Sequence, residues 1–251
     1  MSQLVSIIIP NYKTRLMTEL CLRSLKRYTD MSRVEVIVVD NDSRDDSVEY
    51  LRGLDWIKLI ERKTEGESGP VMHSKALDLA LEGVKSKYTL VMHTDTIVTC
   101  SGWLDFLIDK IEANERIAAV GSWKLERVSW LKRLCKKGED LLRRILNRRK
   151  ALDREHYFRS HCAFYRTDLL KACKSTFATG PSAGIAVFNE LRGNGYELPF
   201  IASEELSHYI LHLNHATLVL NPTPGARKTN SKIARKKLLR EISELEARLE
   251  K

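Results

Sequence analysis

The feature that most limits how this chain can fold is an apolar, strand-like segment that runs directly into a polar cluster, within residues 87–103 (KYTLVMHTDTIVTCSGW). The apolar part favours a buried strand, and His93, Thr94 and Asp95 stand at its carboxyl end. In open α/β sheets, ligands bind outside the carboxyl ends of the strands, so this cluster is well placed for chemistry. Alternation along an extended chain places His93 and Asp95 on the same face.

These residue types can bind a cation. Asp95 can hold a hard divalent ion through oxygen, and His93 can add a nitrogen ligand if the ion is Mn-like. Such an ion could neutralise a diphosphate leaving group. The alternative interpretation is that Asp95 caps the turn before a helix at residues 102–113, while His93 is a core histidine with satisfied hydrogen bonds. This stretch alone favours neither interpretation.

Apolar runs and helical spacings alternate through the N-terminal half. The elements expected, in chain order, are strand 4–10, helix 18–28, strand 34–39, helix 46–52, strand 57–60, helix 73–83 and the strand that begins after residue 87. Continuous apolar runs of this length are typical of central parallel strands. The alternation predicts an α/β fold with a mostly parallel, right-handed sheet flanked by helices.

Composition fits one globular domain with appendages, since 43% of the 251 residues are hydrophobic and 30% are charged. No apolar run approaches the roughly 20 residues that span a bilayer, and the first residues lack a signal-peptide pattern. We therefore expect a cytoplasmic protein. The five cysteines have no CxxC spacing, which argues against a zinc site or a disulfide framework.

The net charge of +9 is concentrated in two segments. Residues 124–150 carry a net charge of +8, and residues 227–251 carry +5, so the remainder of the chain is mildly acidic. Basicity therefore does not mark the whole chain as a nucleic-acid binder.

Several motifs, taken in order, resemble the family 2 glycosyltransferases, which have the GT-A fold. The matching pieces are VSIIIPNYK, VEVIVVDNDSRDDSVEYL, LVMHTDTIVTCSGWL, HCAFYRTDLL and LRGNGYEL. Together they cover most of residues 4–220, and the third piece stands where the family carries its DxD motif. The resemblance implies a nucleotide-diphosphate-sugar donor and a divalent metal, Mn²⁺ or Mg²⁺.

The resemblance also implies a donor pocket at the ends of the first two strands. Pro10, Asn11 and Tyr12 would line it, and Asp40, with Asn41 beside it, would bond the base or ribose. Loops at adjacent strand ends converge on one crevice, which supports this assignment. The alternative is that residues 40–42 are simple turn residues.

The chain departs from the family pattern at the first acidic residue of DxD, which is His93 here. Asp95 keeps the position of the main metal contact. His93 and Thr94 would contact the ribose or diphosphate of the donor, or His93 would join the metal ligands.

A second departure concerns the catalytic base. The family usually places an acidic pair shortly before the arginine and Gly-Tyr that resemble Arg192, Gly195 and Tyr196, but Ala183 and Gly184 stand there. An inverting transfer needs a base that accepts the proton of the acceptor hydroxyl. Glu190 and Asp168 are the candidate bases, and Glu190 could equally be a solvated helix residue.

The densest polar cluster lies in SEELSHYILHLNHATLVLNP. Its members are Glu204, Glu205, His208, His212 and His215. The family often has a histidine near this place that reaches back to the metal, so His212, and after it His215, are candidate ligands. If residues 205–213 are helical, Glu204, His208 and His212 share a face; if they are extended, the two histidines still share a side. Histidines near a strand end are also often structural.

The two basic segments lie outside the core pattern. Residues 124–150 fit two short amphipathic helices, which would lie on an anionic membrane or on the protein's own surface. Residues 231–251 predict a terminal helix that either pairs with another copy, giving a homo-oligomer, or docks on the domain. We therefore expect a glycosyltransferase domain over residues 1–222 with a basic insertion, then a linker and a basic helix over residues 223–251.

The sequence thus predicts an inverting glycosyltransferase that acts on a glycan or lipid-linked acceptor at the inner face of a membrane, in cell-surface polysaccharide assembly. A catalytically degenerate transferase that binds a nucleotide or a partner is one alternative. A basic nucleic-acid-binding protein is another, although aromatic residues are not interleaved with the charge. A nucleotidyltransferase would have a glycine-rich, arginine-bearing loop after the first strand. That class is disfavoured because the corresponding segment here, PNYKTRL, has no glycine.

Overall fold

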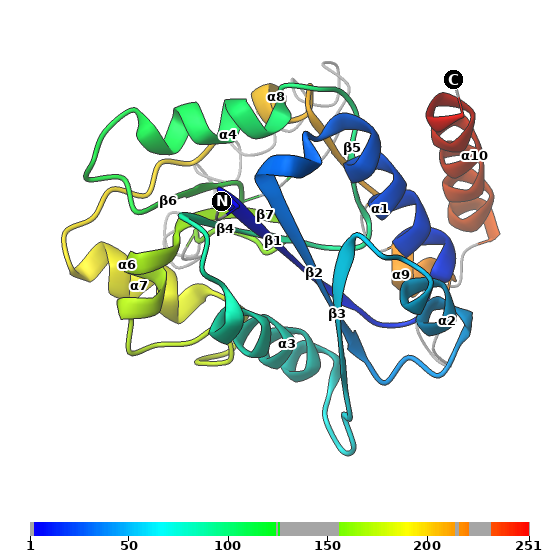
Figure 1. The fold of residues 1–251 in the computed structure, drawn as a ribbon, viewed down its shortest axis with the longest axis horizontal. Coiled ribbons are helices and arrows are strands. Elements are labelled where there is room, and N and C mark those ends of the chain that lie inside the picture. The colour runs from blue at the N-terminus through cyan, green and yellow to red at the C-terminus, as the bar shows by residue number, and fades with distance from the viewer. Residues whose placement is uncertain (1–2, 124, 126–155, 214–215, 221–231, 251) are drawn as a thin grey trace, which may run out of the picture.

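The computed structural model of the chain describes residues 3–123, 125, 156–213, 216–220 and 232–250 (Figure 1). Its centre is a six-stranded sheet in the order β3-β2-β1-β4-β7-β6. The strands are β1 (Val5–Asn11), β2 (Val34–Asn41), β3 (Ile57–Arg62), β4 (Tyr88–Met92), β6 (Ala119–Gly121) and β7 (Cys162–Arg166). Strands β1 to β4 run parallel, whereas β7 is antiparallel to both β4 and β6. The predicted α/β fold with a mostly parallel sheet is confirmed.

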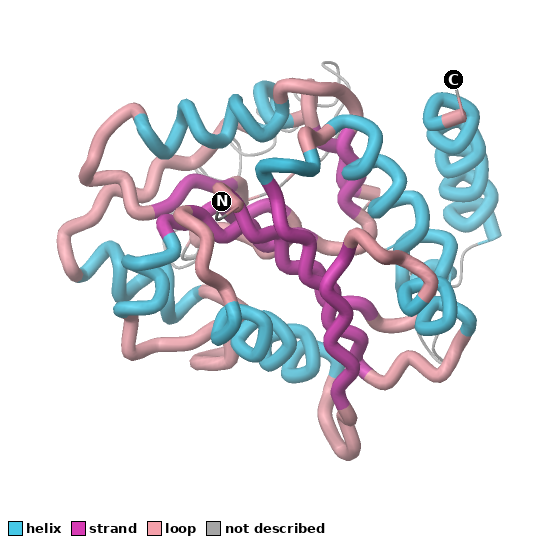
Figure 2. The backbone as a smooth tube through the Cα atoms, in the orientation of Figure 1, coloured by secondary structure: helices cyan, strands magenta, loops and turns pink. Residues whose placement is uncertain are grey.

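A second, two-stranded sheet pairs β5 (Thr96–Val98) with β8 (Ile210–His212) in antiparallel register. Figure 2 shows β5 as a short strand set apart from the central sheet. Since β5 follows β4 after only three residues, this small sheet ties the end of β4 to a segment more than a hundred residues away.

Helices cover both faces of the central sheet. They are α1 (Arg15–Tyr28), α2 (Asp46–Arg52), α3 (Gly69–Gly83), α4 (Trp103–Glu112), α6 (Thr167–Ala172), α7 (Ile185–Gly193), α8 (Ser203–Leu206), α9 (Ala216–Leu220) and α10 (Lys232–Leu249), with a 3-10 turn at Met31–Arg33. Apolar side chains of α1, α4 and α10 pack with Ile7 and Ile9 on one face, and those of α3, α6 and α7 pack with Ile8 on the other. Alternation along β1 therefore feeds two separate cores.

The observed bounds differ from the expected ones in informative places. Strand β2 continues through Asn41, so Asp40 and Asn41 belong to the buried strand rather than to the turn. Helix α3 begins at Gly69, because Pro70 occupies its first turn, where a missing N–H costs nothing. The helical alternative for residues 205–213 is wrong: α8 ends at Leu206, and His212 lies in a strand.

The C-terminal helix α10 docks on the domain. Leu238, Ile242 and Leu245 are buried and belong to the same core cluster as α1, and the Arg27 guanidinium donates to the backbone oxygen of Leu249. Of the two expected arrangements for this helix, the structure shows docking. Within the described ranges, every helix is too short or too polar to cross a membrane.

Candidate active site

The polar cluster that the sequence analysis identified lies at the carboxyl end of β4. After Met92 the chain leaves the sheet through His93, Thr94 and Asp95 and enters β5 at Thr96. Asp95 is 6% exposed, and Thr94 is also buried. Helix α4 begins after Gly102, and no side chain caps its first turn. The alternative interpretation, in which Asp95 caps the turn before this helix, is therefore wrong.

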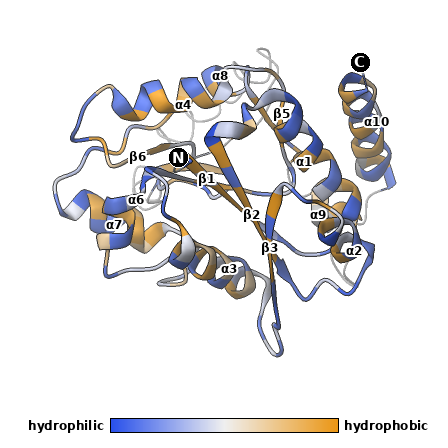
Figure 3. Cartoon of the chain, in the orientation of Figure 1, coloured by the Kyte–Doolittle hydropathy of each residue, from blue (hydrophilic) through white to orange (hydrophobic). Residues whose placement is uncertain are grey.

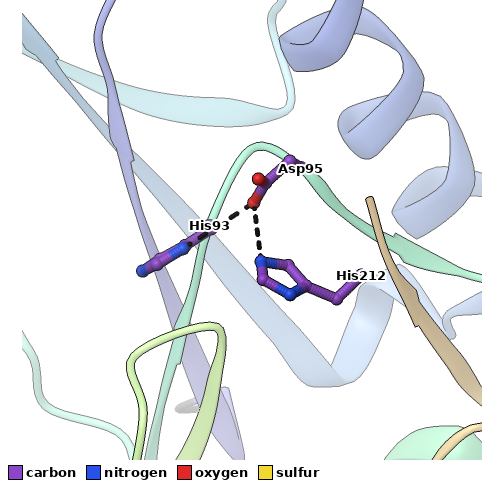
Figure 4. A group of neighbouring side chains, drawn as sticks. All are labelled: His93, Asp95 and His212. Atoms are coloured by element: carbon purple, nitrogen blue, oxygen red, sulfur yellow. Dashed lines mark ion pairs between the residues drawn. The ribbon is translucent and has the colours of Figure 1, made fainter. Parts of the chain in front are cut away.

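Strand β8 brings His212 to the same place. Antiparallel pairing sets Thr96 opposite His212, and the backbone N–H of Leu213 donates to the carbonyl oxygen of Asp95 at 2.9 Å. The Nε2 atom of His212 lies 3.2 Å from Asp95 Oδ1, and the Nδ1 atom of His93 lies 3.7 Å from the same oxygen (Figure 4). One carboxylate and two imidazoles thus face one another, with their ligand atoms within 4.8 Å.

Electrostatics in this cluster favour an ionised carboxylate. Burial alone raises the pKa of Asp95, but the imidazoles of His212 and His93 outweigh that effect and hold its pKa well below the ordinary range. A buried anion without a compensating charge is costly. Hydrogen bonds from the two imidazoles, or a cation held together with them, would compensate the charge of this carboxylate.

Two further polar residues line the cluster, and sequence reasoning did not pick them out as site residues. Strand β7 is antiparallel to β4, with Cys162 opposite Met92, so the residues that precede β7 lie beside those that follow β4. The Oγ atom of Ser160 lies 2.8 Å from Nε2 of His93, and the ring of His161 stacks on that of His212 with centroids 4.7 Å apart. The antiparallel direction of β7 was the missing signal.

A second layer of contacts fixes these groups. The Nε2 atom of His161 lies 2.8 Å from Ser122 Oγ, and Nε2 of His73 lies 3.0 Å from Ser160 Oγ. Burial lowers the pKa of His161 to about 2 and that of His73 to about 3, so both imidazoles are neutral near pH 7. We call these four imidazoles, those of His73, His93, His161 and His212, together with Asp95, the histidine cluster.

The loops after β1 and β2 form a different kind of site. The side-chain amide of Asn11 donates to Asp40 at 2.7 Å, to Ser47 at 3.1 Å and to Ser43 at 3.2 Å, while its oxygen accepts from Thr18 at 2.6 Å. Asp40 also accepts from the hydroxyl and the backbone N–H of Ser43. These five side chains, the asparagine network, are all buried.

Backbone strain marks the same two loops. Lys13 and Thr14 after β1, and Asp42 and Arg44 after β2, have φ between 51° and 60°, which is left-handed and disfavoured without glycine. Each such residue costs on the order of 1–3 kcal/mol and persists where the surroundings dictate it. The backbone N–H of Lys13 donates to Ser43 Oγ at 2.9 Å, so the asparagine network joins the two loops.

The other residues assigned to the donor pocket lie along this edge. Pro10 is buried within β1, and Tyr12 follows with 39% of its surface exposed. Asn41 is buried, and its side-chain oxygen accepts from Arg62 at 2.8 Å. Three of these residues, Pro10, Asp40 and Asn41, are therefore buried supports of the loops. Tyr12 is the exposed member of the set.

The two candidate bases lie elsewhere. Both carboxylate oxygens of Glu190 accept backbone N–H groups, those of Lys174 and Ser175, each at 2.7 Å, and these bonds lower its pKa. Asp168 follows β7 at the end that pairs with Tyr88, the start of β4, so it stands at the opposite edge of the sheet from His93. The structure thus places Glu190 against the loop after α6 and Asp168 at the opposite edge of the sheet, and it brings neither carboxylate to the histidine cluster.

Two further histidines, His208 and His215, were part of the predicted polar cluster. His208 is exposed in the turn between α8 and β8, and its carbonyl oxygen accepts from Thr99. His215 lies outside the described residues, as does almost all of the basic insertion at residues 124–150.

The donor set fits a divalent transition ion. It offers one carboxylate oxygen and two imidazole nitrogens, and both histidines can present an unprotonated nitrogen to an ion. Imidazole and carboxylate together suit Mn²⁺ better than Mg²⁺, which prefers oxygen alone. Ser160 contacts the ring of His93 and His161 that of His212, as the outer partners of metal ligands commonly do.

Comparison with known proteins agrees with this architecture. The mannosyltransferase PcManGT from Pyrobaculum calidifontis, solved in complex with GDP-Man and Mn²⁺, matches with a TM-score of 0.58 and 18% identity, over 80% of this chain and 55% of that one. TarS 1–349 from S. aureus matches with a TM-score of 0.55 and 17% identity, over 90% of this chain and 68% of that one. This chain thus spans about half the length of the mannosyltransferase. A search of curated proteins finds no sequence match.

The fold is that of the GT-A glycosyltransferases. The sequence profile of glycosyl transferase family 2 matches residues 6–173, which is most of the chain. The chain belongs to glycosyl transferase family 2.

Proposed function

We propose that this protein transfers a sugar from a nucleotide-diphosphate donor to a glycan or lipid-linked acceptor, with a divalent cation held by His93, Asp95 and His212. The observation that carries the proposal is the convergence of these three side chains on one point at the carboxyl edge of a GT-A sheet. A bound Mn²⁺ would offset the negative charge that develops on the departing diphosphate.

The protein's own residues would orient the donor around that ion. Tyr12, exposed beside the strained loop after β1, is placed to contact the base. The asparagine network would hold the two loops in the shape that receives the nucleotide, with Asp40 as a structural member that has an oxygen lone pair left for the ribose. Thr94 would add a contact next to the metal ligands.

For Glu190 we propose a structural role rather than that of the base. Its carboxylate ties the loop after α6 to α7 through two backbone N–H groups. A base must accept a proton near neutral pH, and bonds that lower the pKa of a carboxyl make it a weaker base. Asp168, at the far edge of the sheet, has no place in the proposed mechanism.

We also propose inversion at the anomeric carbon, which rests on the family resemblance. The GDP-mannose and Mn²⁺ of the mannosyltransferase from Pyrobaculum calidifontis make that pair the first choice of donor and cation. Assembly of a cell-surface polysaccharide at a membrane would fit a lipid-linked acceptor.

A ligand panel tests the proposal. GDP-mannose and UDP-, CMP- and dTDP-sugars would each be added with and without Mn²⁺, and thermal unfolding and calorimetric binding would be followed. A donor at 100 times its dissociation constant should stabilise the fold by about 2.7 kcal/mol. We expect one nucleotide class to stabilise the protein only when Mn²⁺ is present. Binding of a donor without turnover of any acceptor would instead favour a degenerate transferase, and no binding at all would contradict the proposal.

A further inference from the structure

The first half of α10 concentrates positive charge on the outside of the domain. Between Lys232 and Arg240 it has five basic residues and no acidic one, whereas its second half has Glu241, Glu244 and Glu246 against Arg248. The exposed basic residues are Lys232, Arg235, Lys236, Lys237 and Arg240. We call them, together with Ile233, the basic half of α10.

The docking of the helix fixes which side faces outward. Leu238, Ile242 and Leu245 are buried against the core. At 100° per residue, Lys232, Lys236 and Arg240 form a stripe on the opposite side, and Ile233 lies in that stripe with 82% of its surface exposed. Figure 3 shows the helix banded in hydrophilic and hydrophobic residues, as an amphipathic element requires.

This arrangement costs helix stability. The N-terminal end of a helix carries partial positive charge, so cations there are unfavourable, and the first turn of α10 has no acidic residue. Like charges four residues apart, as in Lys232, Lys236 and Arg240, add repulsion. Among the described residues, Lys232, Arg235 and Lys236 form no ion pair, and Arg240 reaches only Glu244. Departures from a local rule of this kind are expected at functional surfaces.

We propose that the basic half of α10 binds the anionic headgroups of a lipid bilayer, with Ile233 entering the apolar boundary. Clustered Lys and Arg are attracted to anionic lipids, and an exposed aliphatic side chain among them adds apolar burial. A nucleic acid fits less well, because α10 has no aromatic residue on which a base could stack.

The location of this surface links the bilayer to the active site. Helix α10 contacts α9, which follows His212 in the chain. A cavity of about 340 Å³ lies between them, and both Lys237 of the basic half and His212 line it. A bilayer on the basic half would therefore bring lipid headgroups beside the cavity that reaches the metal-ligand histidine.

Vesicle flotation of the full chain tests the proposal without any need for catalysis, so its failure is separate from failure of the proposed transfer. The vesicles would be phosphatidylcholine alone or with about 30% phosphatidylglycerol. Each cation contributes about a five-fold gain in affinity for an anionic surface, so Lys232→Gln, Lys236→Gln and Arg240→Gln together should weaken binding roughly 100-fold. Ile233→Ser should weaken it about ten-fold.

A matched variant controls for net charge. Lys58→Gln, Lys85→Gln and Lys174→Gln remove the same charge from exposed sites in β3 and in two loops, and should leave binding unchanged. Circular dichroism and thermal unfolding check that all variants are folded. Equal binding of the α10 variant and the wild type to anionic vesicles would overturn the proposal. Binding of the wild type to RNA but not to vesicles, or to neither, would also overturn it.

Discussion

The asparagine network after β1 and β2 and the histidine cluster after β4 lie at the same edge of the sheet, but their polar atoms are satisfied in different ways. In the network, Asn11 has a partner for its amide and its oxygen, and Asp40 accepts from three donors. In the cluster, two imidazole nitrogens and a buried carboxylate oxygen all point to one place.

This difference distinguishes a structural hydrogen-bond network, the frame, from a candidate cation-binding site. A network of complementary donors and acceptors needs nothing further and stabilises the loops that it joins. In the cluster, each of the two imidazoles can donate an N–H to the ionised carboxylate or, through an unprotonated nitrogen, join it in holding a cation. Substitutions in the network should therefore mainly change stability, and substitutions in the cluster should mainly change cation and donor binding.

The largest effect is expected at His212. His212→Ala removes one proposed metal ligand and should lower the rate of glycosyl transfer at least about 100-fold, because a catalytic cation contributes several kcal/mol of charge stabilisation. Initial rates with a fixed donor and Mn²⁺ measure this. His208→Ala is the control, since that histidine is exposed and lies outside the cluster. Similar rates for the two variants would remove His212 from the mechanism.

The next largest effect is expected on the stability of the asparagine network. Asn11→Ala leaves Asp40 and Thr18 without their shared partner in a buried site, and should lower the free energy of unfolding by about 2 kcal/mol. Urea denaturation of the variant and of Asn194→Ala, an exposed asparagine after α7, gives the comparison. A loss no larger than that of the control would show that the network is not a frame.

A smaller effect on metal affinity is expected at His161, whose ring stacks on His212. His161→Ala should weaken Mn²⁺ binding about ten-fold, since partners that orient metal ligands typically contribute that much. His161→Phe keeps a ring in the stack and should lose less. Calorimetric titration with Mn²⁺ measures both variants. If Phe and Ala give the same loss, the stack does not position His212.

The smallest effect is expected at Glu190, outside both regions. Two backbone N–H groups lower its folded-state pKa, so its contribution to stability is present above the unfolded-state pKa and is lost as the pH falls through the folded-state value. Glu190→Gln should lower Tm at pH 7 by about 2 °C, and the difference should shrink once the pH falls below the ordinary glutamate pKa of about 4.3 and vanish below the folded-state value. Transfer activity should persist. Loss of activity with unchanged Tm would identify Glu190 as the base instead.

The sequence predicted the parallel part of the sheet because apolar runs that end in polar residues are local signals. Strands β1, β2 and β4 and the helix Asp46–Arg52 begin within about a residue of their expected starts. Asp95 and His93 could be found for the same reason. His212 was predicted from the family resemblance, but His73, Ser160 and His161 could not be predicted as site residues, since the periodicity of a strand does not reveal its direction.

His161 shows this limit most clearly. It lies in a motif that resembles the family, yet its place beside His212 depends on the antiparallel pairing of β7 with β4 and of β8 with β5. Likewise, three partners of Asn11 come from β2, α1 and α2. These contacts join residues that are distant in the chain, and no local pattern indicates them.

The most direct test of the account is calorimetric binding of Mn²⁺ to the wild type and to Asp95→Asn, with Asp109→Asn, an exposed position on α4, as the control. The amide keeps the shape of the side chain but removes the charge that the two histidines surround. We predict that the wild type and Asp109→Asn bind one Mn²⁺ with the same affinity, and that Asp95→Asn binds it at least about 100-fold more weakly. Unchanged Mn²⁺ affinity in Asp95→Asn would show that the histidine cluster is not the metal site.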